Sequence, residues 1–494
     1  MDFKTLKPSQ VVTETPKEEG TNAGSGSLAF EVTYVKERKT SSRRPSRLNS
    51  LTLAFLGLVV VLAPLPFESH RPLPWTLWAV LVGVATLIYF FARLVQRESG
   101  KTRWHKQASV ILIALILPIG ALLQLLPAGD LNTGVVPPEL ASPYITLNQA
   151  NSSIAILRLF TYLGVFILTL EVCTRPSRVK QLMHWILFGA TAHALLAMVL
   201  LRMLGDTGLF AEKAYYSGWA TGAFINRNSF ATYLGIGLVC GIALLQTPNT
   251  ATSGPRRSVT LDPLSSKAFY NLVCCLCIGL ILIVLLASGS RMGLAASLFA
   301  ALFVALPMWR QATSGFAQWT VTGFVLLACL VAVVIFGNDF IDRVLIVDND
   351  FGVRTNLYRQ VYDLIWTRPL LGYGLDSFPL LYPLVHAAPV NSSFTYDLAH
   401  STYLTLWVEM GLIVGSAPMV ALLLVAVKLC FGKRNATGSV PGVRFAFATL
   451  VLCAVHSTVD FSLEKEANVL LFVIVMALGL SQVGAVTPLP TRRD

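Results

Sequence analysis

The sequence predicts an all-α, polytopic membrane protein with about twelve transmembrane helices. Hydrophobic residues make up 54% of the 494 residues and charged residues only 13%, about half the charged share of a soluble globular protein. The apolar residues gather into runs that are long enough to cross a bilayer. Lysine and arginine fall mostly between these runs, in loops that return to the same side.

The apolar runs are expected to be helices because a segment surrounded by lipid must satisfy its own backbone hydrogen bonds. Residues 51–337 are predicted to hold nine transmembrane helices and residues 401–485 a further three. The predicted segments are 51–66, 73–93, 108–127, 153–172, 181–204, 228–246, 268–288, 291–309, 319–337, 402–428, 443–457 and 467–485.

The polar ends and the basic loops predict the orientation. Residues 1–50 are expected to be a disordered, basic cytoplasmic tail, and residues 486–494 a second cytoplasmic tail. The first 30 residues contain no apolar run, which argues against a cleavable signal peptide. With the N-terminus inside, 27 of the 38 lysines and arginines lie on the cytoplasmic side. The net charge of +12 therefore reflects topology, and we expect no nucleic-acid partner.

Residues 338–400 are predicted to form one large outer loop with its own amphipathic helix over 352–367. The loop carries seven aspartates and four arginines. Two stripes repeat at helical spacing, and Arg368-Pro369 ends the pattern. The stripes are Val353, Leu357, Val361 and Ile365 on one face and Arg354, Tyr358, Tyr362 and Trp366 on the other. We expect this helix to lie at the outer membrane surface, where it could cover a lateral groove.

Two arginines lie where the predicted spans meet the outer face. Arg291 follows Ser290 in the short junction between the seventh and eighth spans, where it either meets an anionic ligand or snorkels at a helix boundary. Arg227 opens the sixth span between Asn226 and Asn228. Either asparagine can cap the helix, and a capped helix start beside an arginine favours phosphate, although a cap alone would also explain the pattern.

Two histidines occupy the same side. His400 stands at the mouth of the tenth span, followed by Tyr403 and Glu409, and is either a titrating group or a structural one. His456 and Asp460 are four residues apart, so on a helix they could hydrogen-bond, unless the segment is only a local cap.

Other patterns do not predict metal or ion sites. Gly372-Tyr373-Gly374 lacks the preceding residues of a potassium filter. Asp348-Asn349-Asp350 lies in an acidic loop and is better explained as a solvated turn, and Cys274 and Cys277 lie inside an apolar run. We therefore expect no metal and no cofactor.

Together these motifs resemble the O-antigen ligase and O-antigen polymerase family of bacterial inner membranes. The resemblance extends over residues 150–480. It is carried by Phe224 to Phe230, Ser288 to Gly293, Leu371 to Gly374 with Phe378, and His400 to Leu404 with Glu409 and Gly411. The His-Ser-x-x-Asp-Phe element at residues 456–461 is similar to a feature of the members linked to exopolysaccharide and O-antigen assembly.

The resemblance implies a multi-pass inner-membrane glycosyltransferase of the C-type fold that needs no metal. It would move a glycan from undecaprenyl diphosphate, on the periplasmic face, to lipid A core in a ligase or to a lipid-linked glycan in a polymerase. The family's essential residues carry over as catalytic onto Arg227, Arg291 and His400, with Arg354 as a further diphosphate-binding residue. Supporting roles are expected for Asn228, Ser290, Tyr403, Glu409, His456 and Asp460.

The chemistry fits these residue types. Fixed guanidinium groups would stabilise the charge that develops on the leaving diphosphate. His400 could be the general base or a hydrogen-bond donor to the diphosphate, and the acceptor leaves no short motif. The alternative, a lipid-linked oligosaccharide flippase or transporter, is disfavoured because the sequence shows no internal repeat and its polar candidates cluster at one face.

Overall fold

The part of the chain that the structure describes is built almost entirely from helices. The computed structural model describes residues 47–69, 71–95, 102–129, 140, 142–246, 266–311, 347–388, 390, 396–433 and 440–484. Within these ranges the only paired extended segment is an isolated antiparallel bridge between Pro127 and Tyr144.

The helices of the described part follow in chain order. They are α1 (Arg47–Leu62), η2 (Phe67–Ser69), α2 (Pro72–Val95), η3 (Trp104–Gln107), α3 (Ala108–Ala114), α4 (Ile116–Leu123), α5 (Gln149–Val172), α6 (Pro176–Arg202), α7 (Arg227–Leu245), α8 (Ser266–Ala287), α9 (Arg291–Gln311), α11 (Val347–Thr367), α12 (Phe378–Val385), α13 (Thr402–Phe431), α14 (Val440–His456), η6 (Ser462–Glu464) and α15 (Glu466–Leu480).

The prediction of an all-α, polytopic membrane protein is confirmed. In the described part, seven helical segments are long and apolar enough to cross a membrane, and four apolar helices are shorter. Together they account for each predicted apolar segment except 319–337, which lies outside the described residues, so the count of twelve stays a prediction. Helix α1 begins at Arg47, inside the predicted tail of residues 1–50. The rest of that tail and residues 486–494 also lie outside the described part.

Helix α7 is the central element of the described helices. In its most apolar stretch 89% of the residues are buried, against 22% for α2. It packs against α6, α8, α9 and α14. A side chain at Gly237 would overlap Ala190 of α6, and one at Gly235 would overlap Ser297 of α9. Small residues therefore let the neighbouring backbones approach α7 closely, as is common between membrane helices.

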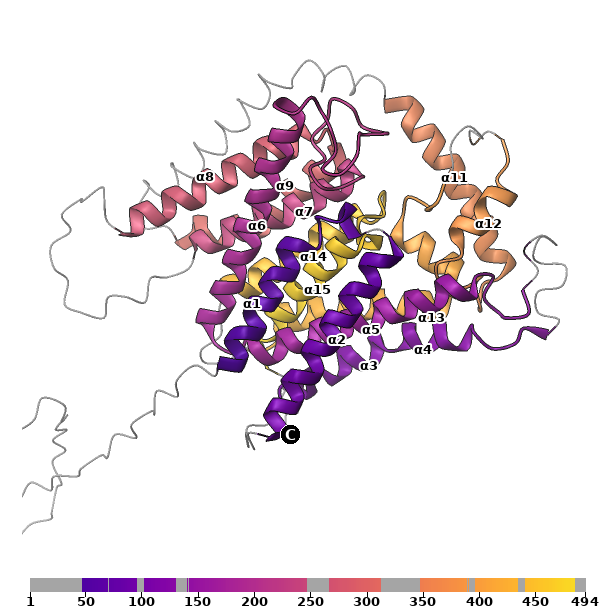
Figure 1. Cartoon of the computed structure of the whole chain (residues 1–494), viewed down its shortest axis with the longest axis horizontal. Helices are drawn as coiled ribbons and strands as arrows, with labels where there is room; N and C mark the ends of the chain where they lie inside the picture. The colour runs from indigo at the N-terminus through magenta and orange to yellow at the C-terminus, as the bar shows by residue number, and fades with distance from the viewer. Residues whose placement is uncertain are drawn as a thin grey trace, which may run out of the picture. The chain divides into compact units, whose positions relative to one another are not determined.

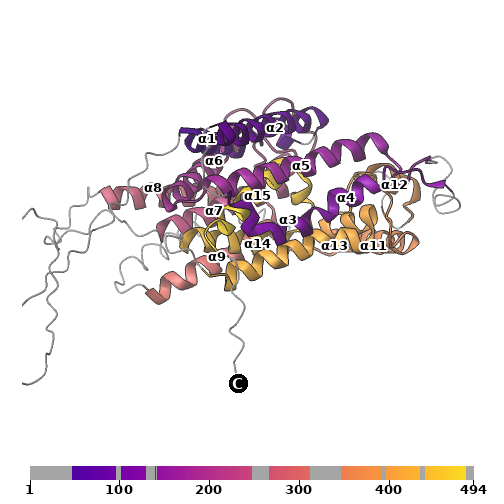
Figure 2. The ribbon, with the colours of Figure 1, turned by 90° about the horizontal axis from the view of Figure 1, so that it is seen from below.

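The remaining helices lie on both sides of this centre. Figure 2 shows α1 and α2 along one side and α9 and α13 along the other, with α5, α7 and α15 between them. Helix α1 packs on α5, α6 and α15, and α13 packs on α3 and α4. Helix α7, which begins with Arg227 and Asn228, is therefore held in place by several neighbouring helices.

The predicted amphipathic helix is present and longer than expected, because α11 begins at Val347 rather than at 352. Leu357, Val361 and Ile365 are buried against α12 and α13, whereas Tyr362 and Trp366 are more than half exposed. Figure 1 shows α11 and α12 together beside the beginning of α13. The predicted apolar face is therefore a packing face within the protein.

The two ends of the helices differ in sequence. The loop end carries the turn at 67–69, the loop at 203–226, the turn at 288–290, the segment 347–401 and the loop at 457–465. The basic end carries basic residues such as Arg93, Arg103, Arg178 and Lys428 near helix termini. The loop end is the one that the basic-loop pattern predicts to face outward.

Candidate functional site

Residues 457–465, which we call the central loop, join the candidate residues of the loop end. The loop forms because α14 ends at His456 and α15 begins at Glu466. Arg354 Nη1 donates to the carbonyl oxygen of Val459 at 3.1 Å, and Asn228 Nδ2 donates to Asp460 Oδ1 at 3.0 Å. Residues that are 105 and 232 positions away from their partners in the sequence thus meet at one loop.

Arg227 is held at the beginning of α7 by a cap and by two aromatic rings. Asn226, not Asn228, is the N-cap: its Oδ1 accepts from the amides of Asn228 and Ser229, at 2.7 and 3.4 Å. The guanidinium of Arg227 lies over the rings of Tyr216 and Trp219, 5.2 and 5.5 Å from their centroids. Such cation–π contacts fix the direction of the guanidinium plane.

The junction that carries Arg291 packs beside the same aromatic pair. Arg291 is the first residue of α9, and the Oγ of Ser290 accepts from the Gly293 amide at 3.3 Å. Gly289 has a positive φ, and a Cβ there would overlap the indole ring of Trp219. Trp219 therefore contacts both the turn that precedes Arg291 and the guanidinium of Arg227.

His400 lies at the entry to α13 in a strained and buried setting. Its φ is +53°, in the left-handed region that is costly for a residue with a side chain, and Tyr358 donates to its carbonyl oxygen at 2.8 Å. Its ring lies 5.0 Å from the ring of Phe461. Burial, reinforced by the positive charge of Arg354, lowers the pKa of His400 to about 4. The imidazole is therefore neutral near pH 7.

The possible hydrogen bond between His456 and Asp460 does not form. Because α14 ends at His456, Asp460 lies beyond the helix and the spacing of four residues no longer brings the two side chains together. His456 Nδ1 instead bonds the hydroxyl of Thr232 at 2.7 Å. Asp460 is bound by Asn228 and by the hydroxyl of Ser462.

Glu409 and the glycine motif form a backbone junction. Gly411 has a φ of +73° and interrupts α13. The amides of Tyr373 and Gly374 donate to the carbonyl oxygens of Val408 and Glu409 at 3.0 and 2.9 Å, and a Cβ at Gly372 would overlap the backbone of Glu409. The Glu409 carboxylate accepts from the Phe378 amide at 3.1 Å. These motif residues position the segment before α12 against α13.

Sequence reasoning missed two charged residues of the loop end, Glu68 and Lys465. Both are buried, and their charged atoms are 4.0 Å apart. Burial raises the pKa of Glu68 to about 8, helped by Asp460 and opposed by Lys465 and the Asn226 amide. Each lies in a short turn between two apolar runs on the predicted outer side, and that position was the signal that could have identified them.

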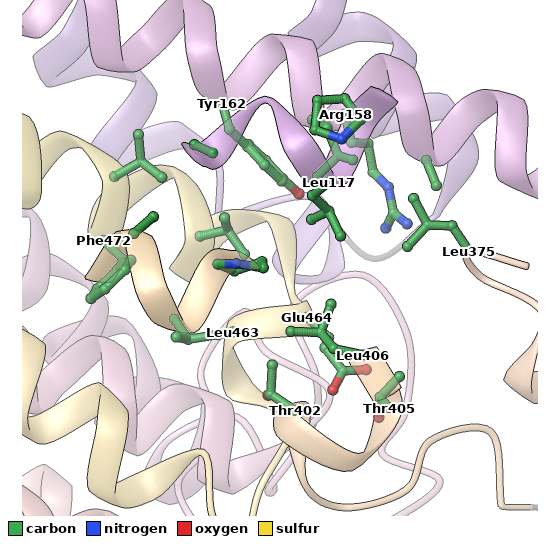
Figure 3. Close-up of a pocket in the computed structure, with 18 of the residues that line it drawn as sticks. Leu117, Arg158, Tyr162, Leu375, Thr402, Thr405, Leu406, Leu463, Glu464 and Phe472 are labelled. Atoms are coloured by element: carbon green, nitrogen blue, oxygen red, sulfur yellow. The ribbon is translucent and has the colours of Figure 1, made fainter. Parts of the chain in front are cut away.

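A cavity of about 630 Å³ adjoins this cluster. Tyr403 and Glu409 line it, together with residues of α3, α4, α5, α13 and α15, whereas Arg227, Arg291, Arg354 and His400 do not. Of the α11 residues that the structure describes, none contributes to the wall, so the loop reaches the cavity at 375–379 and 397–398 instead. Figure 3 shows Tyr162 and Arg158 on one wall and Glu464 near Thr402 and Thr405 on another.

Among the described residues, no group of three or more His, Cys, Asp or Glu side chains is arranged to hold a metal ion. The charged groups that the loop end does gather are arginines, a lysine and carboxylates.

Comparison with known proteins places these residues in a family. A search of curated proteins finds no match to the chain. Residues 276–419 match the family model described as O-antigen ligase. The match contains Arg291, Arg354, His400 and Glu409, while Arg227, Asn228 and the central loop lie outside it. Residues 276–419 are thus similar to the O-antigen ligase family, and the apolar helices around them are those of a multi-pass membrane protein.

Proposed function

We propose that the protein transfers a glycan from undecaprenyl diphosphate to lipid A core or to a lipid-linked glycan, at the periplasmic face of a bacterial inner membrane. The bond between the sugar C1 and the diphosphate oxygen breaks, and a bond from C1 to the acceptor hydroxyl oxygen forms. Undecaprenyl diphosphate leaves with the bonding electron pair, and the hydroxyl proton passes to a base. The supporting observation is that Arg227, Arg354 and His400 converge around the central loop, at the end opposite the basic loops.

The arginines are proposed to bind the diphosphate. Arg227 is oriented by Tyr216 and Trp219 before any ligand arrives, so little reorganisation is needed when charge develops on the leaving oxygen. Arg291 begins α9, where the helix N-terminus adds a favourable field for an anion. In a reaction without a metal ion these fixed cations would supply the charge stabilisation.

His400 is proposed to accept the proton of the acceptor hydroxyl. It is neutral near pH 7, and its buried Nδ1 has no hydrogen-bond partner among the described residues. A bound diphosphate would bring negative charge close to the ring and raise its pKa from about 4 toward the range in which a general base is effective. Arg354, which lowers the pKa in the free protein, would then be neutralised by the donor.

The test is deletion of the gene, complementation with variants and analysis of the cell's glycans. Arg291→Ala and His400→Ala should abolish transfer while the protein still inserts. Arg359→Ala removes an exposed arginine of α11 and is the matched control that should restore transfer. Free lipid A core with long undecaprenyl-linked polymer identifies a ligase, and single-repeat products identify a polymerase. Normal surface polysaccharide in either active-site variant would refute the assignment. Accumulation of donor on the cytoplasmic face would indicate a flippase.

A further inference from the structure

The cavity beside the central loop has an apolar body and one polar end. Its body is formed by side chains such as Leu117, Leu406 and Phe472, from α4, α13 and α15. Apolar walls between membrane helices suit a hydrocarbon chain. The polar end includes Thr402, Thr405 and Glu464, which Figure 3 shows close together.

The cations at this polar end already face carboxylates. Arg158 lies 3.6 Å from Asp376, and its guanidinium stacks 4.1 Å from the ring centroid of Trp75. Lys465 lies 4.0 Å from Glu68. Asp397 and Glu464 add further carboxyl groups to the wall. A second anion such as a diphosphate would compete here with Asp376 for Arg158.

The polar end contains one carboxyl oxygen without a donor, although threonine hydroxyls lie beside it. Oε1 of Glu464 is buried and has no hydrogen-bond partner among the described residues. A buried oxygen of this kind costs free energy unless a ligand supplies a donor. Sugar hydroxyls are donors that match carboxyl oxygens and threonine hydroxyls. The cavity therefore combines a place for a lipid chain with a place for a neutral, hydroxyl-rich headgroup.

We propose that this cavity is the acceptor site, and that it binds a lipid-anchored molecule through sugar hydroxyls at Glu464, Thr402 and Thr405 while the diphosphate donor binds at the arginines. The inference rests on the proposed function and adds a second, chemically distinct site to it. The two sites adjoin at residues 397–402, because Asp397, Leu398 and Thr402 line the cavity and His400 stands between them. An acceptor hydroxyl at this end would be close to the proposed base.

The test is a pair of binding measurements on the full-length protein in phosphatidylcholine nanodiscs. One probe is a fluorescent dialkyl glucoside and the other is undecaprenyl diphosphate. Glu464→Gln and Thr405→Val should each weaken glucoside binding about tenfold, as expected for one hydrogen bond, and change diphosphate binding less than about twofold. Arg227→Ala should do the reverse. Glu212→Gln, at an exposed glutamate of the 203–226 loop, is the matched control and should change neither.

Each result decides between the assignments. If the cavity variants weaken diphosphate binding instead, the cavity holds the donor's lipid chain and the inference is wrong. The same follows if the wild-type protein binds no glucoside above the nanodisc background. If the cavity variants behave as expected but Arg227→Ala leaves diphosphate binding intact, the donor assignment fails and the acceptor site stands. Thermal unfolding of each variant in the same nanodiscs separates loss of binding from loss of folding.

Discussion

The basic end and the loop end both contain buried charged groups, but in the described part several polar atoms of the loop end have no hydrogen-bond partner. At the basic end Glu171 forms an ion pair with Arg93 at 2.6 Å and accepts from the backbone amides of Arg103 and Trp104. Lys428 donates to Gln107 at 3.0 Å, and Gln107 donates to the carbonyl oxygen of Leu480 at 3.1 Å. These bonds tie α2, α5, α13 and α15 together.

The loop end leaves polar atoms without partners in the described part of the chain. Glu68 Oε2, His400 Nδ1, Ser229 Oγ, Glu464 Oε1 and Asn468 Oδ1 are buried and make no hydrogen bond there. Proteins rarely leave such atoms unsatisfied unless a ligand or a reaction uses them. Under the proposed function, buried charge serves folding at one end and meets the substrate at the other.

The largest effect is expected for His400, and it tests whether the loop end carries the reaction. His400→Ala should lower the transfer rate roughly 100- to 10,000-fold, the range for loss of a general base. The unfolding temperature should fall modestly, because the buried ring loses its contact with Phe461, and the rate is therefore normalised to folded protein. The measurement is transfer by purified protein with a lipid-linked donor. A rate within threefold of wild type would show that the loop end does not depend on this imidazole.

The second effect concerns Glu171 at the basic end. Glu171→Gln removes the buried charge that pairs with the half-buried Arg93 and weakens its hydrogen bonds, so the free energy of unfolding should fall by about 1.5–3 kcal/mol. The transfer rate per folded molecule should remain that of the wild type. Thermal unfolding in nanodiscs and a rate normalised to folded protein check both parts. A lost rate at unchanged stability would mean that the basic end also takes part in the reaction.

The third effect is a pH dependence that belongs to His400. Its pKa is about 4 in the folded protein, against an ordinary value near 6.5 when unfolded. Between these values the unfolded chain binds the proton and the folded chain does not, so stability is complete above pH 6.5 and falls as the pH decreases toward 4. His400→Gln should remove this part of the acid sensitivity. Parallel unfolding curves for the two proteins from pH 7 to 4.5 would contradict the assigned burial.

The helices could be predicted from sequence because lipid allows an apolar run little else. The predicted segment 402–428 begins at the same residue as α13, Thr402–Phe431. The first segment, predicted as 51–66, is displaced because the apolar residues after Leu62 form a turn that leads into three residues of positive φ. The break of α13 at Gly411 was not foreseen, since it depends on backbone contacts with the distant residues 369–374.

The site could be predicted only as separate pieces. Arg227, Arg291 and His400 were identified because polar residues at span ends are unusual, and the alternation of the spans put them on one side, whereas Arg354 was added through the family resemblance. The central loop, which Arg354, His400 and Asn228 contact, was recognised only by its His-Ser-x-x-Asp-Phe element, and that element does not show what the loop contacts. Helical spacing paired His456 with Asp460, whereas tertiary contacts gave each a partner on α7. Glu68 was missed because its only signal is its position in a turn between two apolar runs, and such a position does not show which residues it contacts.

The smallest expected effect compares Glu68 with Glu171. Burial raises the pKa of Glu68 to about 8, so at pH 7 the folded protein holds it mostly protonated and glutamine is a close substitute. The unfolded chain loses the proton near pH 4.5, so the wild type loses stability as the pH rises from 4.5 to 8. Glu68→Gln lacks this loss, and its stability relative to the wild type should therefore increase over the same range. Unfolding temperatures at pH 5 and pH 8 measure the trend. If the variant instead loses stability relative to the wild type as the pH rises, Glu68 is ionised and paired with Lys465, as Glu171 is with Arg93. The contrast between the two ends would then depend on His400 and Glu464.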